Sequence, residues 1–234
     1  MAMNFVDEQQ KYPRPRQARE EKLEIVKELF SKAGVEYIDF EILLRILKEE
    51  KELEVWAKTD TAETYVLIKT YAFTAFSGTL GPKRRQGDLQ IPEGVYHIDR
   101  YNPASNFHLS LGLNYPNKSD RIRKSAPDSG GDIFIHGNAV TIGCIPLGDE
   151  AIKELYTIAV DARSNGQTKI PVYIFPCRMT DKGNSQLIQR LTTDKPKLKS
   201  FWDELMPIYK AFDSLKVIPR ISIDSSGQYQ IKGH

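Results

Sequence analysis

The sequence predicts an α+β fold in which a mainly antiparallel β-sheet is flanked by helices. Short runs that alternate apolar and polar residues recur in the middle of the chain, for example at 53–57 and 107–111, and a period of two is typical of strands with one buried face. Apolar residues spaced by three and four occur instead at 19–33 and 198–215, which is the helical period. No apolar run approaches the roughly 20 residues that a membrane-spanning helix needs.

The composition excludes several classes of protein. The 234 residues are 40% hydrophobic and 27% charged, which is ordinary for a globular protein. The net charge of +2 is too balanced to indicate a nucleic-acid partner. Residues 1–19 lack the basic and then apolar pattern of a secretory signal, so no signal peptide is visible in this sequence.

Residues 1–38 are expected to form an N-terminal lead-in and an amphipathic helix. Residues 1–18 are polar and carry two prolines among basic residues, which predicts a solvated, loosely ordered segment. In 19–33 the apolar residues fall on one helical face, and Gly34 ends the run. These apolar residues are Leu23, Val26, Leu29 and Phe30. Because acidic and basic residues are mixed on this helix, we expect it to pack on the main domain rather than to meet a membrane or partner.

Residues 39–180 are expected to form the main domain, and its front half reads as an antiparallel meander with a charged turn. The predicted strands are 42–47, 53–57, 65–76, 91–98, 107–111 and 169–176. A long polar loop over 114–131 is typical of a lid or a binding loop. A helix is expected over 151–163, with Asp149 as its N-cap.

Residues 181–234 are expected to form a C-terminal helical extension that packs on this domain. Helices are predicted at 184–191 and 198–215, the second interrupted near Pro207 because an internal proline removes a helical hydrogen bond. Weak alternation over 217–229 favours a last strand.

The stretch 133–146 carries the strongest chemical signal. It contains His136 and Cys144, and a short turn between two apolar runs, 133–135 and 139–142, predicts a hairpin. Opposed side chains of a strand pair lie about 5 Å apart, so the imidazole would face the thiol. An imidazole that takes the proton of a thiol produces the thiolate nucleophile of a cysteine enzyme.

Gly143 supports this hypothesis. A glycine leaves the approach to the sulfur open, and the amides of Gly143 and Cys144 are placed to donate to a developing oxyanion. The competing interpretation is structural, because a single cysteine is more often a buried core residue than a nucleophile.

The remaining cysteine and histidines each allow two interpretations. Cys144 and Cys177 either form a disulfide or are one working thiol and one buried thiol; Cys177 follows an apolar run, so we expect it in the core. His97 and His108, taken with His136 and Cys144, would be the ligands of a zinc site. No short Cys-x-x-Cys or His-x-x-x-His spacing occurs, so we expect no metal and no cofactor.

The loop 81–88 holds three consecutive basic residues, Lys83, Arg84 and Arg85. One interpretation is a solvated charge run. The second is an anion-binding loop, because arginine grips a carboxylate with a rigid pair of donors.

Residues from about 42 to 178 resemble the catalytic domain of the L,D-transpeptidase (YkuD-type) family, in particular its YafK-like branch. The motifs that carry the resemblance are Gly81-Pro82-Lys83, Gln86-Gly87-Asp88, Pro92-Glu93-Gly94-Val95-Tyr96, Tyr115-Pro116-Asn117 with Asp120, Ile135-His136-Gly137 and Thr141-Ile142-Gly143-Cys144. Each motif is weak alone, but the combination in this order is specific.

The resemblance implies a mainly antiparallel β-sandwich of the L,D-transpeptidase type with a Cys–His cleft. It implies that Cys144 attacks a stem-peptide carbonyl next to a diaminopimelate-type residue of peptidoglycan, with His136 as base and Gly143 beside the nucleophile. Arg84, Arg85, Asn138 and Thr141 are the expected substrate-binding residues. The implied partners are peptidoglycan stem peptides with an amine acceptor or a wall-anchored protein, and the implied location is the periplasm or cell envelope.

The chain departs from many family members at one position. They have a second histidine two places before the nucleophile, where this sequence has Ile142. The departure leaves open whether the thioester passes to an amine or to water, as in an L,D-carboxypeptidase or an amidase. The sequence is also compatible with a non-catalytic peptidoglycan-binding protein and with an unrelated cysteine hydrolase.

Overall fold

Eight strands form one curled, mostly antiparallel sheet in the computed structural model, which describes residues 4–232. The strands are β1 (Phe40–Leu47), β2 (Glu52–Thr59), β3 (Val66–Ala72), β4 (Gly94–Asn102), β5 (Ser110–Leu113), β6 (Phe134–His136), β7 (Ile145–Pro146) and β8 (Pro171–Phe175), in the order β3-β2-β1-β8-β4-β5-β6-β7. Only the β1–β8 and β6–β7 pairs are parallel within this sheet. The predicted α+β class with a mainly antiparallel sheet is confirmed.

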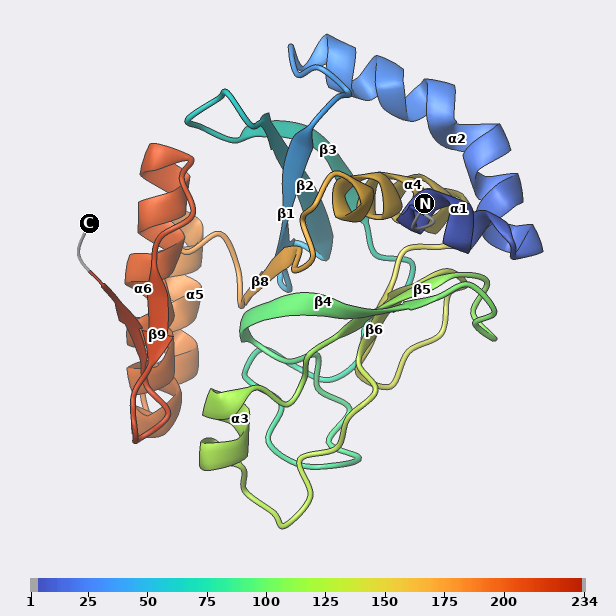
Figure 1. Cartoon of the computed structure of the whole chain (residues 1–234). Helices are drawn as coiled ribbons and strands as arrows, with labels where there is room; N and C mark the ends of the chain where they lie inside the picture. Colours follow the sequence, from blue (N-terminus) through green and yellow to red (C-terminus); the bar gives the residue numbers. More distant parts are fainter. Residues whose placement is uncertain (1–3, 233–234) are drawn as a thin grey trace.

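Helices cover the sheet from two sides (Figure 1). They are α1 (Phe5–Gln10), α2 (Pro13–Lys32), α3 (Lys118–Arg123), α4 (Asp149–Ser164), α5 (Lys182–Thr192) and α6 (Pro196–Leu215), and a small hairpin of β9 (Ile221–Ile223) and β10 (Tyr229–Ile231) follows. Helices α1, α2 and α4 gather on one side of β1–β3, and α5, α6 and the hairpin lie on the other. None of the described helices is both long and apolar enough to cross a bilayer.

Strand β1 is buried on both faces. Ile42, Leu44 and Ile46 belong to the core beneath α4, whereas Leu43 and Leu47 belong to a second core beneath α6. A near-continuous apolar run is what a strand covered on both faces requires. The sequence of β1 therefore explains why helices pack on both sides of the sheet.

Helix α4 lies between α2 and the sheet strands β1, β5 and β6. Its polar residues on the α2 side are paired rather than solvated: Asp161 accepts from Arg19 at 2.6 Å, and Lys153 donates to Glu21 at 2.7 Å. Buried charges need such partners, so α2 is held on α4 by specific ion pairs as well as by apolar contacts.

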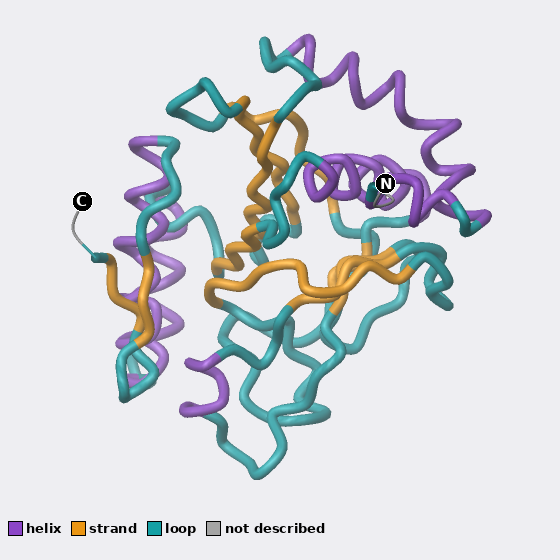
Figure 2. The backbone as a smooth tube through the Cα atoms, in the orientation of Figure 1, coloured by secondary structure: helices purple, strands orange, loops and turns teal. Residues whose placement is uncertain are grey.

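The loops that precede β4 and β6 lie side by side below the sheet (Figure 2). The backbone N–H of Gln86 donates to the Asp128 carbonyl at 3.1 Å, and that of Ser125 donates to the Arg84 carbonyl at 3.0 Å. These bonds join loop 81–91 to the long polar loop after α3.

The N-terminal segment differs from the expectation of a loosely ordered lead-in. Residues 5–10 form α1, capped by the Asn4 side chain, and α2 begins at Pro13. Pro13 and Pro15 fall in the first turn of α2, where backbone N–H groups have no helical acceptor, so the prolines cost no hydrogen bond there.

Two further helix predictions were wrong in detail. Helix α6 continues through Pro207, because the proline is exposed and the buried face is carried by its neighbours Ile208 and Tyr209. The N-cap of α4 is Gly148 rather than Asp149, whose carboxylate instead accepts the Asn138 N–H at 2.8 Å.

Candidate active site

The histidine and cysteine lie at the ends of a parallel strand pair, not on a hairpin. Strand β6 pairs in parallel with β7, and the run 139–142 is a loop between them. The loop begins at Asn138 with φ +61° and ends at Gly143 with φ +134°, so the chain turns back twice and β7 runs in the same direction as β6. Ile142 is 78% exposed, which explains why this apolar run forms no strand.

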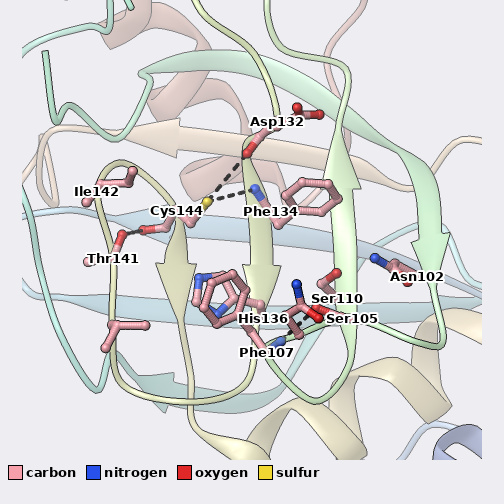
Figure 3. Close-up of a pocket in the computed structure, with 12 residues that line it drawn as sticks. Asn102, Ser105, Phe107, Ser110, Asp132, Phe134, His136, Thr141, Ile142 and Cys144 are labelled. Carbon is pink, nitrogen blue, oxygen red and sulfur yellow. Dashed lines mark hydrogen bonds between the residues drawn. The ribbon is translucent and has the colours of Figure 1, made fainter. Parts of the chain in front are cut away.

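A cavity of about 470 Å³ brings His136 and Cys144 together (Figure 3). The lining residues are Asn102, Ser105, Asn106, Phe107, Ser110, Asp132, Phe134, His136, Val140, Thr141, Ile142 and Cys144. They come from the end of β4, the β4–β5 loop, the start of β5, strand β6 with the residues just before it, and the β6–β7 loop. The cavity therefore lies in the part of the sheet formed by β4, β5, β6 and β7.

Backbone groups hold the Cys144 thiol in the cavity. Its Sγ accepts from the Phe134 N–H at 3.4 Å and donates to the Asp132 carbonyl at 3.6 Å. Burial raises the pKa of the thiol, and the Phe134 N–H only partly offsets this. The group is therefore a neutral thiol at neutral pH.

A backbone hydrogen bond fixes the tautomer of His136. Its Nδ1 bonds the Gly137 carbonyl, which only accepts, so Nδ1 carries the proton and Nε2 is left as a base. Burial lowers the pKa of this imidazole. Within residues 4–232 the imidazole and the thiol share no hydrogen bond, so the pair is at rest as neutral thiol and neutral imidazole.

Thr141 binds the backbone on both sides of the Cys144 side chain. Its Oγ1 accepts from the Gly143 N–H at 3.1 Å and donates to the Cys144 carbonyl at 2.8 Å. The Gly143 amide, which we expected to be a free oxyanion donor, is thus occupied in this structure. The Cys144 N–H has no partner among the hydrogen bonds of the described residues.

The structure does not bring the two arginines to the cavity. The Arg84 guanidinium donates to Asp120 at 3.0 Å and lies over the Phe201 ring, and the Arg85 side chain is exposed. The basic loop instead wraps Asp88, which accepts from Lys83 Nζ and from the backbone N–H groups of both arginines. Contacts within the protein therefore account for the charges of Lys83 and Arg84, but not for that of Arg85.

Asn138 also lies outside the cavity lining. Its carbonyl accepts from Thr74 Oγ1 at 2.9 Å, and its side chain accepts its neighbour's N–H. Of the four expected substrate-binding residues, Thr141 is the one that lines the cavity.

Sequence reasoning missed Phe107 and Asp132. The Phe107 ring packs on the His136 ring with centroids 4.7 Å apart. Asp132, at φ +53°, presents its carbonyl to the thiol. The sequence offered one clue to Asp132, which is that it lies just before the strand that carries His136. It offered no clue to Phe107, because the contact of this ring with His136 depends on how the β4–β5 loop folds.

The remaining cysteine and histidines do not join the site. Cys177 is buried in the core beneath α6, as predicted, and both thiols are free. Burial raises the pKa of Cys177 to about 12. The residues of the zinc hypothesis are not assembled: in the described part of the chain no three His, Cys, Asp or Glu residues are grouped to hold a metal ion.

Comparison with known proteins identifies a family for this chain. The family described as L,D-transpeptidase catalytic domain (YkuD) matches residues 43–174. YafK of Escherichia coli (strain K12), provisionally named an L,D-transpeptidase, is 32% identical over 192 residues, which are 81% of this chain and 73% of YafK.

Two solved structures show weaker similarity. The helical cell shape determining protein Pgp2 from Campylobacter jejuni is 19% identical with a TM-score of 0.47, covering 85% of this chain and 80% of Pgp2. Bd1075 from Bdellovibrio bacteriovorus is 21% identical with a TM-score of 0.43, covering 79% and 77%. On the strength of the domain match and the similarity to YafK, the chain belongs to the L,D-transpeptidase catalytic domain family.

Proposed function

We propose that this protein is a cysteine-dependent L,D-transpeptidase that acts on peptidoglycan stem peptides. The observation that carries the proposal is one cavity lined by the Cys144 thiol and by an imidazole whose tautomer leaves Nε2 unprotonated. This is the nucleophile and general base that acyl transfer needs. The family membership supplies the substrate class.

The proposed reaction begins from the neutral pair. As Cys144 Sγ attacks the carbonyl next to a diaminopimelate-type residue, His136 Nε2 takes the thiol proton, and the Cys144 N–H donates to the oxyanion. The imidazolium then protonates the leaving amine, and a thioester remains. His136 next deprotonates the acceptor amine, which attacks the thioester and restores the thiol.

Hydrolysis of the thioester is the second candidate. Ile142 stands where many family members have a histidine, and it is a largely exposed apolar residue of the cavity. If water replaces the acceptor amine, the same pair makes an L,D-carboxypeptidase or an amidase that cuts a peptide or protein link. The intact Cys–His pair favours either reaction over a non-catalytic peptidoglycan-binding role.

We assign substrate contacts to Thr141 and to Arg85. Thr141 lines the cavity, and Arg85 is exposed with no side-chain hydrogen bond or ion pair among the described residues, so its guanidinium is available to a stem-peptide carboxylate outside the cavity. Because peptidoglycan lies outside the cytoplasm, the proposal places the protein in the cell envelope.

Mass spectrometry of digested peptidoglycan tests the reaction type. Purified peptidoglycan is incubated with the protein or with Cys144→Ala, and the fragments are compared. New crosslinks or amine adducts support transpeptidation, whereas loss of crosslinks, terminal residues or protein anchors supports hydrolysis. Identical fragments from both proteins contradict the enzymatic proposal.

A further inference from the structure

The β4–β5 loop (103–109) forms one wall of the cavity. Ser105, Asn106 and Phe107 line it, and the Phe107 ring covers the His136 imidazole at a centroid distance of 4.7 Å and an interplanar angle of 33°. Figure 3 shows the two rings stacked in the cavity. The position of this loop therefore decides how the proposed base is covered and oriented.

The loop is anchored at its end, where Leu109 is buried and its carbonyl accepts from the Gly137 N–H at 3.2 Å, but residues 104–108 make few bonds of their own. Its internal side-chain bonds are short-range, from the Ala104 N–H to Asn102 and from the Phe107 N–H to Ser105 Oγ. His108 has φ +69°, a conformation that costs energy for a residue with a Cβ. Something outside the loop must hold this geometry.

Arg14 supplies that support from a distant part of the chain. Its Nη1 donates to the Ser105 carbonyl and, at 2.8 Å, to the His108 carbonyl. The two acceptors flank Asn106 and Phe107, so a single guanidinium nitrogen ties the loop on both sides of the ring that covers His136. Arg14 lies outside the residues that match the catalytic-domain family.

The helix that carries Arg14 is a firm platform. Arg14 is in the first turn of α2, whose neighbouring residues Pro15 and Ala18 are buried and whose Arg19 pairs with Asp161 of α4 at 2.6 Å. The Arg14 side chain itself is at the surface. Its loss is therefore not expected to disrupt the core.

We propose that Arg14 is a positioning residue: from α2 it clamps the β4–β5 loop, and through that loop it holds Phe107 on the imidazole of His136. The N-terminal helices are thereby a part of the active site. Without the clamp the loop moves, water reaches the imidazole, and the ring loses its fixed orientation.

The pKa of His136 can be measured without any substrate, and it shows whether Arg14 keeps the imidazole covered. Burial lowers the pKa of His136, so uncovering the ring moves this pKa up toward the ordinary value of about 6.5. We expect an NMR titration to show the rise in Arg14→Ala, with the His136 signal assigned by its absence in His136→Asn. Arg14→Lys, whose ammonium can donate to both carbonyls, should restore the wild-type value.

Arg16→Ala is the matched control. Arg16 lies on the same helix and carries the same charge, but its exposed side chain makes no hydrogen bond or ion pair within residues 4–232. It should leave the pKa of His136 unchanged. If the pKa of His136 rose equally in Arg16→Ala, the cause would be the lost positive charge, and the proposal would be overturned. An unchanged pKa of His136 in folded Arg14→Ala would overturn it as well.

A double-mutant cycle tests whether Arg14 acts through Phe107. Phe107→Ala should raise the pKa of His136, and adding Arg14→Ala to it should give no further rise, because the ring that the clamp positions is already gone. Full additivity of the two shifts would show that Arg14 does not act through Phe107 and would overturn the proposal.

Activity gives a separate readout that rests on the proposed function. Because misplacement of a catalytic group by about 1 Å can cost up to about 100-fold, we expect Arg14→Ala to lower turnover by about 10- to 100-fold with little change in KM. A raised KM with unchanged turnover would contradict the positioning role. If the wild-type protein is inactive on peptidoglycan, the proposed function fails, while the titration still decides the clamp.

Discussion

At the scale of single residues, burial acts on both members of the Cys144–His136 pair in the same direction. It raises the pKa of the thiol and lowers the pKa of the imidazole, so each shift disfavours the charged form. The resting pair therefore differs from the thiolate–imidazolium pair of enzymes whose cysteine has a depressed pKa. In the proposed reaction, the thiol proton therefore moves to His136 as Cys144 attacks.

The pH dependence of alkylation follows from these shifts. We expect the rate of Cys144 modification by iodoacetamide to rise with pH and to reach its midpoint above the ordinary thiol pKa of about 8.5, because only the thiolate reacts. Peptide mass spectrometry separates Cys144 from buried Cys177. A reactive plateau that extends below pH 7 would show a preformed ion pair and contradict the neutral one.

Thr141 provides the second prediction at this scale. Thr141→Val keeps the shape of the side chain but removes both hydrogen bonds to the backbone around Cys144. At about 1 kcal/mol for each net hydrogen bond, we expect a loss of about 1–2 kcal/mol in urea unfolding and a slower reaction. Thr141→Ser retains the hydroxyl and should stay near wild type; equal losses in both variants would contradict the role of the hydroxyl.

How far the sequence predicts the site depends on the kind of residue. The sequence points to Cys144 and His136 because their side chains have distinctive chemistry close together in the chain, and both line one cavity in the structure. Phe107 carries no such signal, because a ring that covers an imidazole looks like any exposed aromatic until the loop is folded. Arg84 shows the opposite case. Its charge suggested that it binds a substrate carboxylate, but in the structure its guanidinium pairs with Asp120 of the protein itself.

At the scale of elements, the β6–β7 unit shows where periodicity fails. Apolar residues at 139–142 predicted a strand, but period and composition do not report which direction a partner strand runs. The positive φ of Asn138 and Gly143 sets the path of the loop and yields a parallel pair. Most other strands of the sheet lie close to where we predicted them, because each has a buried face and turn residues at its ends. The exception is β5, predicted at 107–111 and found at Ser110–Leu113, because residues 107–109 alternate like a strand but belong to the β4–β5 loop.

Gly143 tests the importance of that path. At φ +134° a side chain is strained, and a Cβ at Gly143 would lie 3.0 Å from the Gln90 carbonyl oxygen. We expect Gly143→Ala to lower the free energy of unfolding by at least about 1–3 kcal/mol and to displace Cys144, which slows its alkylation.

Gly166→Ala is the matched control for this variant. Gly166 also has a positive φ, +110°, but a Cβ there meets no atom within 4 Å. Gly166→Ala therefore has the conformational cost of a positive φ without a clash, so it should lower the free energy of unfolding in urea by less than Gly143→Ala does. If both variants lowered the free energy of unfolding equally, the contact between residue 143 and loop 81–91 would be unimportant for stability.

At the scale of the whole molecule, a buried ion pair joins the sheet, loop 81–91 and the C-terminal helix. Lys48 Nζ and Glu93 Oε1 are 3.0 Å apart, and both side chains are fully buried. Glu93 also accepts from the Gly81 N–H and from Trp202 Nε1 of α6, both at 2.7 Å. This network fixes the C-terminal extension on the residues that lead toward the cavity.

Glu93→Gln breaks the charge balance of this network. Leaving a buried charge without its partner costs about 3–5 kcal/mol, and we expect a loss of this size in urea unfolding. The control is Lys199→Met, which breaks an exposed pair with Asp203 and should change stability by less than about 0.5 kcal/mol. A small loss for Glu93→Gln would show that water reaches the pair.

For the whole molecule, the sequence predicted the fold class but not how distant segments pack together. Alternation and helical spacing were enough for an α+β fold with helices at both ends of the chain. The pairing of Lys48 with Glu93 and the clamp of Arg14 on residues 105–108 were not, because both join segments far apart in the sequence and depend on the final packing. Proline also misled the prediction of both helices, for different reasons. In α6 the helix continues through Pro207 because the buried face is carried by its neighbours, whereas Pro13 and Pro15 fit the first turn of α2, a helix start that we did not predict.

Intact-protein mass spectrometry can show whether Cys144 forms a thioester with His136 as the base. The protein is mixed with a defined stem tetrapeptide that contains a diaminopimelate-type residue and is quenched in acid. We expect an acyl adduct on Cys144 that hydroxylamine removes. The adduct should be absent in Cys144→Ala and should form far more slowly in His136→Asn. An adduct that persists in Cys144→Ala would show that Cys144 is not the nucleophile, and one that forms at the wild-type rate in His136→Asn would show that His136 is not the base.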